Sequence, residues 1–578
     1  MGPDPLSNRR TASEPPHSCG GYPAAIDPTA RPEGRGSVFD RRPWLPLAGL
    51  TLLGLALYTP GLGWGIPATV SWSQDTIAGV RTLGAVEHWP EVWLGRYPPL
   101  HYLVLYGVYR PVLSHWRATG QLVTGHDTGE EILTPPQATK IGLLLLLARG
   151  VSVVAGIVAG LGLYAATRRL LDDPLAATLA AAALMAGAAF TYFAHLGNVD
   201  VPSLAWFCWS VYFYVRLLDS GRSLDAALLG LLASAAISTK DPLAGAYPGM
   251  AVVLLVEQTR RLLREHRLPA ALLRALLRPP WLLGLACFAI PYLWLYGAFS
   301  NPHAYLDRLR YWLTPAAESL HARQVRYDTT MALIGAMVRY AAGAVGWPML
   351  AAIVVSTVLA VRRWPRPALV VLLPAATYVL TVIVPIRFVY SRFLLAPLAL
   401  SCILLGKAAS TFCRASLLPA GLKAAVVAAV VCLSLGYAAA IDAELLTDSR
   451  YAAERWFEQN VPRTATIGAS SPPQYLPRLP ERGYRTYSVE MTRDAFDHPQ
   501  PEYLLLSSYD YEDYDVDQRT CMNDLVAGRL GYEVAATFRG RFLGTGRSWL
   551  ALAGWGAPVP GKISPTIIIL RRAARSSS

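Results

Sequence analysis

Stretches of about 20 apolar residues recur along most of this chain, and a helix needs roughly that length to cross a bilayer. The first lies near 44–60, after Arg41 and Arg42. The others lie near 141–166, 174–193, 201–218, 223–239, 243–257, 280–298, 342–361, 367–385, 393–412 and 420–440. Because 53% of the 578 residues are hydrophobic and 16% are charged, the composition excludes an ordinary soluble enzyme. The sequence predicts a mainly α-helical, polytopic membrane protein with about 11 transmembrane helices.

The linkers between these spans fall into two sets. One set is short and basic: Arg168 with Arg169, Arg216 with Arg222, six arginines from Arg260 to Arg278, Arg362 with Arg363 and Arg366, and Lys407 with Arg414. The other set is polar and aromatic: HLGNVDVP at 195–202, STKDP at 238–242, residues 300–341 and PIRFVYSR at 385–392. Only the basic set is typical of cytoplasmic linkers. We therefore expect a cytoplasmic amino terminus and an external carboxyl terminus, in the cytoplasmic (inner) membrane.

The stretch 98–113 is also apolar enough to be a span. A crossing there would place the basic linker from Arg260 to Arg278 outside, which the positive-inside rule disfavours. We therefore predict that 61–139 forms one large external loop, with an interfacial or re-entrant helix at about 98–113.

The two ends of the chain have the composition of non-membrane sequence. Residues 1–40 are rich in Pro, Gly, Ser and Arg, so a disordered basic cytoplasmic tail is expected before the transmembrane domain at 41–441. Residues 442–578 are predicted to form a small external α/β domain. In it, DSRYAAERWFEQNVP at 448–462 predicts an amphipathic helix, TATIGAS, PEYLLLSS and PTIIIL predict strands, and YDYEDYDVD at 509–517 predicts a loop.

Two features of the composition exclude further classes of site. The net charge of +13 would suggest nucleic acid in a soluble protein, but basic residues beside apolar spans are explained by topology, so no nucleic-acid partner is expected. The seven cysteines show neither CxxC nor Cys/His spacing, so the sequence predicts no disulfide framework and no zinc site. Participation of a divalent metal stays open.

The predicted external linkers bring polar residues from separate parts of the chain to one membrane face. They are Asp75, Arg96, His101, His195, Asn198, Asp200, Lys240, Asp241, Arg387, Tyr390 and Arg392. This convergence is the main functional signal of the sequence.

Each of these residues also has a purely structural explanation. Asp75 would cap a helix well, and that role is compatible with catalysis. His195 and Asp200 would suit a polar turn between two helices. Lys240 would reach the membrane interface along its apolar stem, or it would meet a lipid phosphate. Arg387 and Arg392 would anchor a helix end or bind phosphate oxygens through their planar guanidinium groups. Glu87 and Glu91 are weaker candidates because both lie on an amphipathic stretch.

The motifs SWSQDTIAG, RYPPLHYLVL, HLGNVDVPSLAWF, STKDP, SRFLLAPLAL and DSRYAAERWFEQNVP occur in this order over residues 45–460. Together they resemble membrane glycosyltransferases of the GT-C class, in particular bacterial relatives of the dolichyl-phosphate-mannose protein mannosyltransferases and the lipid A aminoarabinose transferase. In that family an acid of the first external loop is the expected catalytic base, which corresponds to Asp75. Many members have two adjacent acids there, whereas this chain has Gln74-Asp75-Thr76, so the resemblance does not support a metal site at this position.

The resemblance implies a glycosyltransferase. It would move one sugar from a polyprenyl-phosphate donor to a lipid, glycan or protein acceptor on the outer membrane face. Asp75 would accept the proton of the acceptor, and a single displacement would invert the anomeric carbon. Arg392, Arg387 and Lys240 would bind and stabilise the leaving phosphate. The remaining substrate-binding candidates are Arg96, His101, His195, Asp200 and Tyr390.

A polytopic transporter or lipid flippase is the alternative from a different class. Transporters place ionisable residues near the middle of the membrane and often consist of repeated halves. In this chain the charges cluster at one edge of the spans and no repeat is visible. A sensor or scaffold with an external domain would not require the large first loop.

Overall fold

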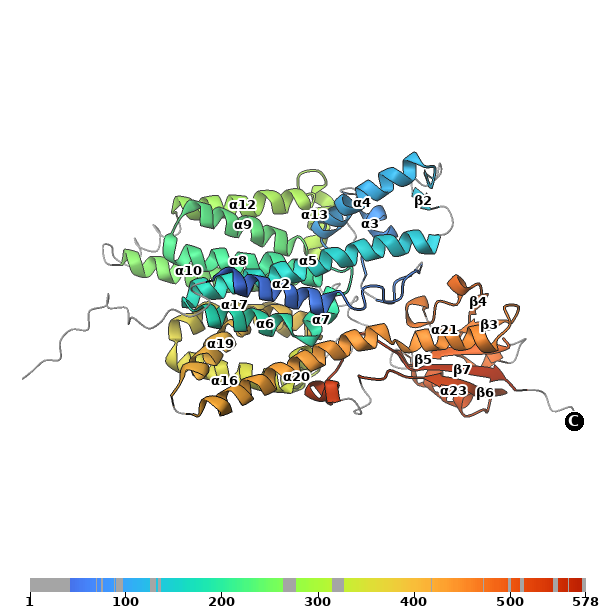
Figure 1. Cartoon of the computed structure of the whole chain (residues 1–578). Coiled ribbons are helices and arrows are strands. Elements are labelled where there is room, and N and C mark those ends of the chain that lie inside the picture. The colour runs from blue at the N-terminus through green and yellow to red at the C-terminus, as the bar shows by residue number, and fades with distance from the viewer. Residues whose placement is uncertain are drawn as a thin grey trace, which may run out of the picture.

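The computed structural model describes residues 42–68, 70–73, 76–87, 89, 97–124, 131–133, 137–263, 277–313, 327–416, 418–470, 472–496, 501–509, 514–543, 549–559 and 561–573. Figure 1 shows a bundle of long helices, with a smaller domain that contains a sheet at one end. The predicted disordered tail at 1–40 lies outside the described residues. The mainly helical fold with a small C-terminal sheet agrees with the prediction from the sequence.

Every predicted span overlaps at least one helix of the bundle. The helices are α2 (Trp44–Tyr58), α5 (Gln137–Leu171), α6 (Pro174–Met185), α7 (Ala188–Ala194), α8 (Asp200–Ser220), α9 (Ser223–Ile237), α10 (Tyr247–Leu262), α12 (Pro279–Leu295), α15 (Thr330–Val345), α16 (Trp347–Arg363), α17 (Pro365–Tyr378), α19 (Leu395–Arg414) and α20 (Ala420–Leu446). Among the described residues, five helices are long and apolar enough to cross a membrane, or up to seven if each of two bent helix pairs is one span. These helices indicate a multi-pass membrane protein, but the predicted number of 11 spans is not confirmed.

The two bent pairs are breaks that the hydropathy pattern does not predict. The axes of α6 and α7 differ by 65°, and those of α15 and α16 differ by 115°. The second break lies at Gly346, whose φ of +84° favours glycine, and Pro348 is the second residue of the next helix. The predicted span at 342–361 therefore includes a sharp turn and is not one continuous helix.

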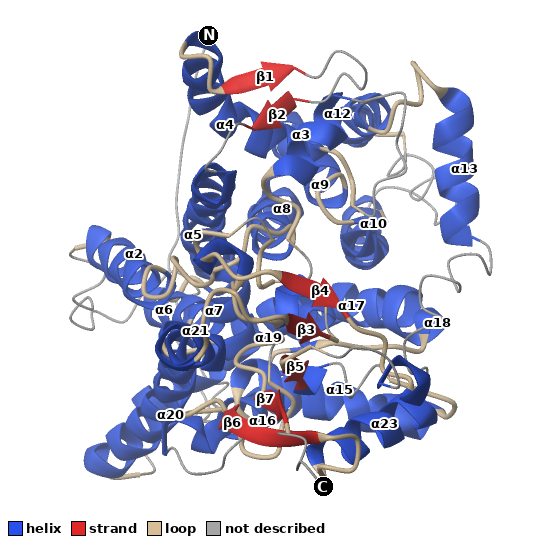
Figure 2. Ribbon diagram, turned by 90° about the vertical axis from the view of Figure 1, so that its right-hand side faces the viewer, coloured by secondary structure: helices blue, strands red, loops and turns tan. Residues whose placement is uncertain are grey.

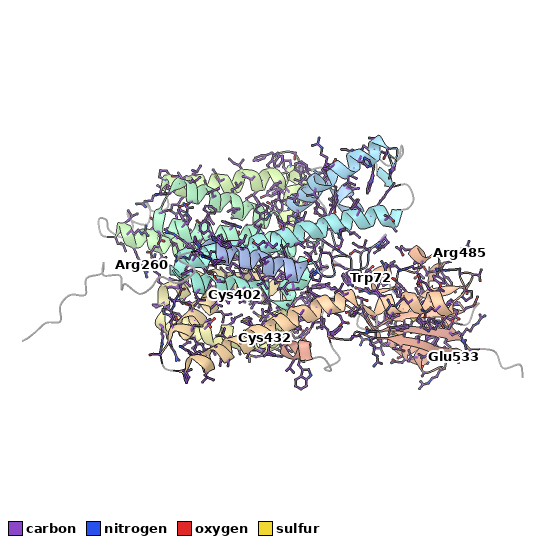
Figure 3. The ribbon with its side chains drawn as sticks, in the orientation of Figure 1. Trp72, Arg260, Cys402, Cys432, Arg485 and Glu533 are labelled. Atoms are coloured by element: carbon purple, nitrogen blue, oxygen red, sulfur yellow. The ribbon has the colours of Figure 1, made fainter. Side chains whose placement is uncertain are left out.

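The basic linkers meet at the end of the bundle opposite the C-terminal domain. Arg169 and Arg366 lie 3.2 and 3.4 Å from the Asp219 carboxylate, and Arg414 lies 2.7 Å from Asp173. Arg260 marks this end in Figure 3. The inference that these linkers share one end of the bundle is confirmed, whereas the side of the membrane stays a prediction.

The stretch predicted as a large external loop contains two helices and a hairpin. Helices α3 (Val80–Glu87) and α4 (Leu100–Ala118) pack against each other, and α4 also packs against α5. Strands β1 (Leu122–Thr124) and β2 (Glu131–Leu133) pair antiparallel. The helix expected at about 98–113 is present as α4, which is not one of the span-like helices in the described part of the chain. Its depth in the membrane stays a prediction.

The C-terminal domain begins with α21 (Ser449–Asn460), whose N-cap is Asp448, as the sequence predicts. Its sheet has the order β4-β3-β5-β7-β6 (Figure 2). The three predicted strands are confirmed as β3 (Ile467–Ala469), β5 (Tyr503–Ser507) and β7 (Ile567–Arg572), whereas β4 (Thr486–Ser488) and β6 (Tyr532–Phe538) were not expected. Strand β3 pairs parallel with β4 and β5, and β7 pairs antiparallel with β5 and β6.

The acidic run at 509–517 is only partly a loop. Residues 510–513 lie outside the described residues, and α23 (Val516–Val526) begins within the run. Asp515 and Gln518 form a capping box at its start, which explains why the helix begins there in spite of the polar sequence.

Candidate functional site

Two turns at the end of the bundle near the C-terminal domain bring together an acid and a cation that the sequence singles out. Asp200 begins α8, and the side-chain amide of Asn198 donates to its Oδ2 at 2.8 Å. The Nζ of Lys240, in the turn after α9, forms an ion pair with Asp200 Oδ1. Both residues are buried, so this pair lies in a low-dielectric setting.

Lys240 also approaches the segment that carries Arg392. Its Nζ lies 5.6 Å from the centroid of the Phe393 ring, and the Arg392 guanidinium carbon lies 5.7 Å from the same centroid. That guanidinium also lies 6.0 Å from the Tyr390 ring. The structure thus places Lys240 and Arg392 beside the Phe393 ring, with Asp200 paired to Lys240 and the Tyr390 ring next to Arg392.

Arg387 has a different environment. It ends the short helix α18 (Val384–Ile386) with a left-handed φ of +53°. Its Nε donates to the carbonyl of Tyr327 at 2.8 Å, and its Nη2 donates to the carbonyl of Asp328. Arg387 therefore stabilises the chain segment that precedes α15.

A second acid and cation lie beside the first pair. Asp241, next to Lys240, accepts hydrogen bonds from the Tyr296 hydroxyl and from Arg308 Nη2, the latter at 2.8 Å. Arg308 belongs to α13 (Pro302–Leu313), and its guanidinium lies 5.2 Å from the Tyr296 ring. Burial raises the pKa of Asp241, and the charge of Arg308 opposes this effect. The sequence predicts a role for Asp241 but not for Arg308, because no motif distinguishes that arginine within the 300–341 linker.

The first external loop lies against these turns through its backbone. The N–H of Ile77 donates to the carbonyl of Gly197 at 3.2 Å, and the N–H of Leu100 donates to the carbonyl of Ser238 at 3.0 Å. The neighbouring His101 is 2% exposed, and burial lowers its pKa to about 3, so the imidazole is neutral.

Several sequence candidates cannot be placed. Asp75, Arg96 and Glu91 lie outside the described residues, and so does the side chain of Glu87.

His195 contacts the backbone of the loop and not the acid–cation pairs. Its Nε2 lies 2.6 Å from the carbonyl oxygen of Pro60, its Nδ1 lies 2.8 Å from that of Thr191, and Asp442 Oδ1 lies 3.5 Å from Nε2. His195 therefore joins the start of the first loop to α7 and α20.

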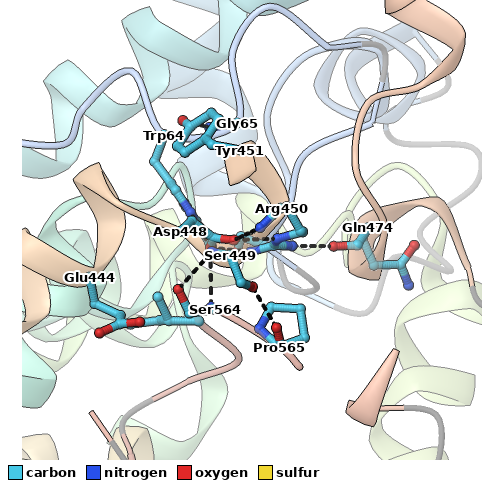
Figure 4. Close-up of polar contacts among 12 residues, drawn as sticks. Trp64, Gly65, Glu444, Asp448, Ser449, Arg450, Tyr451, Gln474, Ser564 and Pro565 are labelled. Atoms are coloured by element: carbon cyan, nitrogen blue, oxygen red, sulfur yellow. Dashed lines mark hydrogen bonds and ion pairs between the residues drawn. The ribbon is translucent and has the colours of Figure 1, made fainter. Parts of the chain in front are cut away.

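A buried cluster joins the first loop to the C-terminal domain (Figure 4). The indole N–H of Trp64 donates to Asp448 Oδ2 at 2.9 Å, and Arg450 forms a bidentate ion pair with the same carboxylate. The Arg450 guanidinium carbon also lies 4.0 Å from the centroid of the Trp72 ring. Trp72 marks this junction in Figure 3. The sequence predicts a helix at DSRY but not this cluster, because it depends on a contact with a distant tryptophan.

A second arginine extends this cluster. Arg478 binds the Glu454 carboxylate with Nε and Nη2, both at 2.8 Å, and its guanidinium carbon lies 5.1 Å from the centroid of the Trp72 ring. Its Nη1 donates to the carbonyl of Pro67 at 3.3 Å. The loop that leads toward Asp75 is thus packed against two arginines of the C-terminal domain.

The described residues contain no group of three or more His, Cys, Asp or Glu side chains that could hold a metal ion. Participation of a divalent metal therefore stays open.

Two solved structures are similar to this chain over most of its length. The first is ArnT from Cupriavidus metallidurans bound to undecaprenyl phosphate, at 13% identity and a TM-score of 0.43, covering 90% of this chain and 97% of that one. The second is the oligosaccharyltransferase AglB from Archaeoglobus fulgidus, in complex with an inhibitory peptide and a dolichol-phosphate. It matches at 13% identity and a TM-score of 0.42, covering 91% of this chain and 76% of that one.

No curated protein sequence matches the chain. A family model matches residues 139–294, which run from α5 to α12 and include the Asp200–Lys240 pair. This match confirms the resemblance that the motifs predict: over residues 139–294 the chain is similar to the dolichyl-phosphate-mannose-protein mannosyltransferase family.

Proposed function

We propose that this protein transfers a sugar from a polyprenyl-phosphate donor to an acceptor on the external face of the cytoplasmic membrane. The match to a mannosyltransferase family over 139–294 supports transfer of a glycosyl group from a lipid-linked donor. The observation that carries the proposal is the position of Lys240 and Arg392 beside the Phe393 ring, at one end of a bundle of apolar helices. A polyprenyl phosphate requires such a combination: cations for its phosphate and an apolar surface for its tail.

The two cations would have distinct roles. Arg392 presents a planar guanidinium, which binds two phosphate oxygens at once. Lys240 carries a compact charge, and its ion pair with Asp200 fixes the position of its ammonium group. As the bond between the anomeric carbon and the phosphate oxygen breaks, negative charge grows on the phosphate, and cations that are already in place stabilise it without reorganisation.

Asp75 remains our candidate for the general base. The acceptor hydroxyl or amine loses a proton as its lone pair attacks the anomeric carbon, and a carboxylate can accept that proton. The described residues on both sides of Asp75 in the sequence are held at this end of the bundle, which supports this choice. Trp72 packs against Arg450, and the N–H of Ile77 donates a hydrogen bond to the carbonyl of Gly197. A single displacement of this kind inverts the anomeric centre.

The direct test uses purified full-length protein in vesicles that contain a polyprenyl-phosphate sugar and a cell-envelope extract as the acceptor. Release of polyprenyl phosphate that depends on the extract is expected for a transferase. A transporter or flippase would move the donor between leaflets and leave the sugar–phosphate bond intact, so movement without release contradicts the proposal. The glycan lost from a deletion strain would identify the sugar and the acceptor.

A further inference from the structure

One segment of the C-terminal domain reaches back to the helix bundle. It consists of η7 (Trp549–Gly554) and the following Trp555. Gly554 packs so closely on Tyr437 of α20 that an added Cβ would lie 2.2 Å from the tyrosine ring. The indole N–H of Trp347 donates to the carbonyl of Trp555 at 3.0 Å. These contacts fix the segment against α20 and against the start of α16.

The segment lies on the flank of the bundle and not on its end. Tyr437 precedes the end of α20 at Leu446 by more than two helical turns, or about 14 Å along the helix axis. In Figure 1 the short red helix beside α20 is η7, whereas the sheet lies beyond the end of the bundle. A part of the nominally external domain therefore lies at the depth of the apolar helices.

The outward side of the segment is apolar. Leu552 is 58% exposed and Trp555 is 73% exposed. The sequence WLALAGWGAPV at 549–559 contains no charged residue, although the rest of the domain is rich in arginine and acids. An exposed indole beside an exposed leucine is unfavourable in water and favourable at the boundary between lipid and headgroups.

Next to this segment, the exposed side of α16 is apolar and is expected to face lipid. On α16, Val354, Val355 and Val358 are all exposed. A bilayer offers no hydrogen bonds, so regular apolar helices of this kind are the structures that it surrounds. Trp347, also exposed, lies between these valines and Trp555, so the apolar surface continues from the bundle onto the C-terminal domain.

Helix α15 extends the same surface. Its axis is bent by 115° from that of α16, so if α16 runs parallel to the membrane normal, α15 lies about 25° from the membrane plane. Met331, Ile334 and Val338 are exposed along one side of α15, whereas Leu333 and Ala336 face the bundle. This pattern is typical of a helix that lies in the membrane interface. Both α15 and α16 contact η7.

We infer that α15 and the segment 549–555 form a membrane-interface surface that seats the C-terminal domain on the bilayer. Its partner is the phospholipid itself, contacted by Trp555, Leu552 and the exposed side of α15. Tryptophan suits this position because its ring is apolar and its edge is polar. The inference is independent of sugar transfer, since it depends only on exposure, continuity and the bend at Gly346.

Photocrosslinking in vesicles of phosphatidylethanolamine and phosphatidylglycerol tests this inference on the full chain. A benzophenone amino acid would replace Trp555 or Leu552 in separate variants. Val355 on α16 serves as the lipid-facing control, and Val516, which is 76% exposed at the start of α23, serves as the water-facing control. We expect phospholipid adducts by mass spectrometry at Trp555, Leu552 and Val355, and none at Val516.

Two results would overturn the inference. Crosslinks between two copies of the chain at Trp555 would show that the surface is a protein interface. A lack of lipid adducts at both Trp555 and Leu552, with adducts still present at Val355, would show that the segment faces water. Because both replaced side chains are largely exposed, the variants should fold, and a test at two positions separates local disturbance from a real absence of lipid contact.

Discussion

The guanidinium carbon of Arg450 lies 4.0 Å from the centroid of the Trp72 ring, so a residue of the C-terminal domain stacks on the first loop three positions before Asp75. Both side chains are almost fully buried. The same guanidinium is tied to Asp448, and Asp448 also holds Trp64. The first loop and the C-terminal domain are therefore one packed unit, although the sequence separates them by the whole helix bundle.

The first prediction concerns the stability of this unit. Arg450→Met leaves the buried Asp448 without its cation, which is expected to cost about 3–5 kcal/mol, and Arg450→Lys should cost less because the charge remains. Arg455→Met on the exposed side of α21 is the control. Thermal unfolding in detergent measures the effect. Equal unfolding temperatures for Arg450→Met and Arg455→Met would show that the cluster does not stabilise the protein.

The second prediction concerns the buried pair of Asp200 and Lys240. Lys240→Met leaves the Asp200 carboxylate buried without its cation, so the variant should be less stable. Combining it with Asp200→Asn should restore part of the stability, with a coupling energy of about 0.5–3 kcal/mol. The double variant should still be defective in transfer from the donor, because Lys240 is proposed to bind phosphate. Additive stability changes, or normal transfer by the double variant, would contradict these roles.

The third prediction concerns Arg392. Arg392→Lys should be partly defective and Arg392→Ala severely defective in transfer, because lysine keeps the charge but loses the planar fork. A loss only in kcat/KM for the donor would indicate a binding role, and a fall in kcat as well would indicate stabilisation of the leaving phosphate. Arg366→Ala at the opposite end of the bundle is the control and should transfer normally. If Arg392→Ala leaves both kcat and kcat/KM for the donor unchanged, Arg392 does not bind the phosphate and only anchors the chain at the membrane interface.

The fourth prediction concerns Asp75. Helix α3 begins only at Val80, so Asp75 does not cap it, contrary to the sequence expectation. Asp75→Asn keeps the size of the side chain but removes the base, so turnover should fall by about 10²- to 10⁴-fold while the protein still folds. Asp307→Asn on α13, where the side chain is 68% exposed, is a matched control. Near-normal turnover of Asp75→Asn at saturating substrate would exclude Asp75 as the base and direct attention to Glu87, Glu91 or Asp200.

The fifth prediction concerns pH and the buried His101. The pKa of His101 is about 3 in the folded protein, and an unperturbed histidine, as in the unfolded chain, has a pKa of 6.5. Between these two pH values the unfolded chain therefore binds a proton that the folded protein does not. Stability is therefore complete above about pH 6.5 and falls as the pH decreases toward 3. His101→Gln should flatten the decrease in unfolding temperature between about pH 7 and pH 4. The exposed His303→Gln should not, and an identical slope for both variants would contradict the assignment.

The amino-acid sequence alone determined the features that repeat locally. Apolar runs predicted where the helices of the bundle lie, and the arginines between them predicted which linkers share an end. The ion pairs of Arg169, Arg366 and Arg414 confirm that second prediction. Three strands and the cap of α21 could also be predicted, because a short alternating pattern or an N-cap residue acts on its immediate neighbours.

Only the tertiary structure decided which polar groups meet. The pairing of Arg308 with Asp241 and the stacking of Arg450 on Trp72 depend on chain segments far apart in sequence, and the bend at Gly346 depends on the backbone conformation of one residue. Hydropathy is a property of windows of about 20 residues, so it cannot detect a single glycine with a positive φ within an apolar run. Packing between distant elements determines which arginines become buried and ion-paired, as it does for Arg450 with Asp448 and for Arg478 with Glu454, and the sequence alone does not distinguish these arginines from the others.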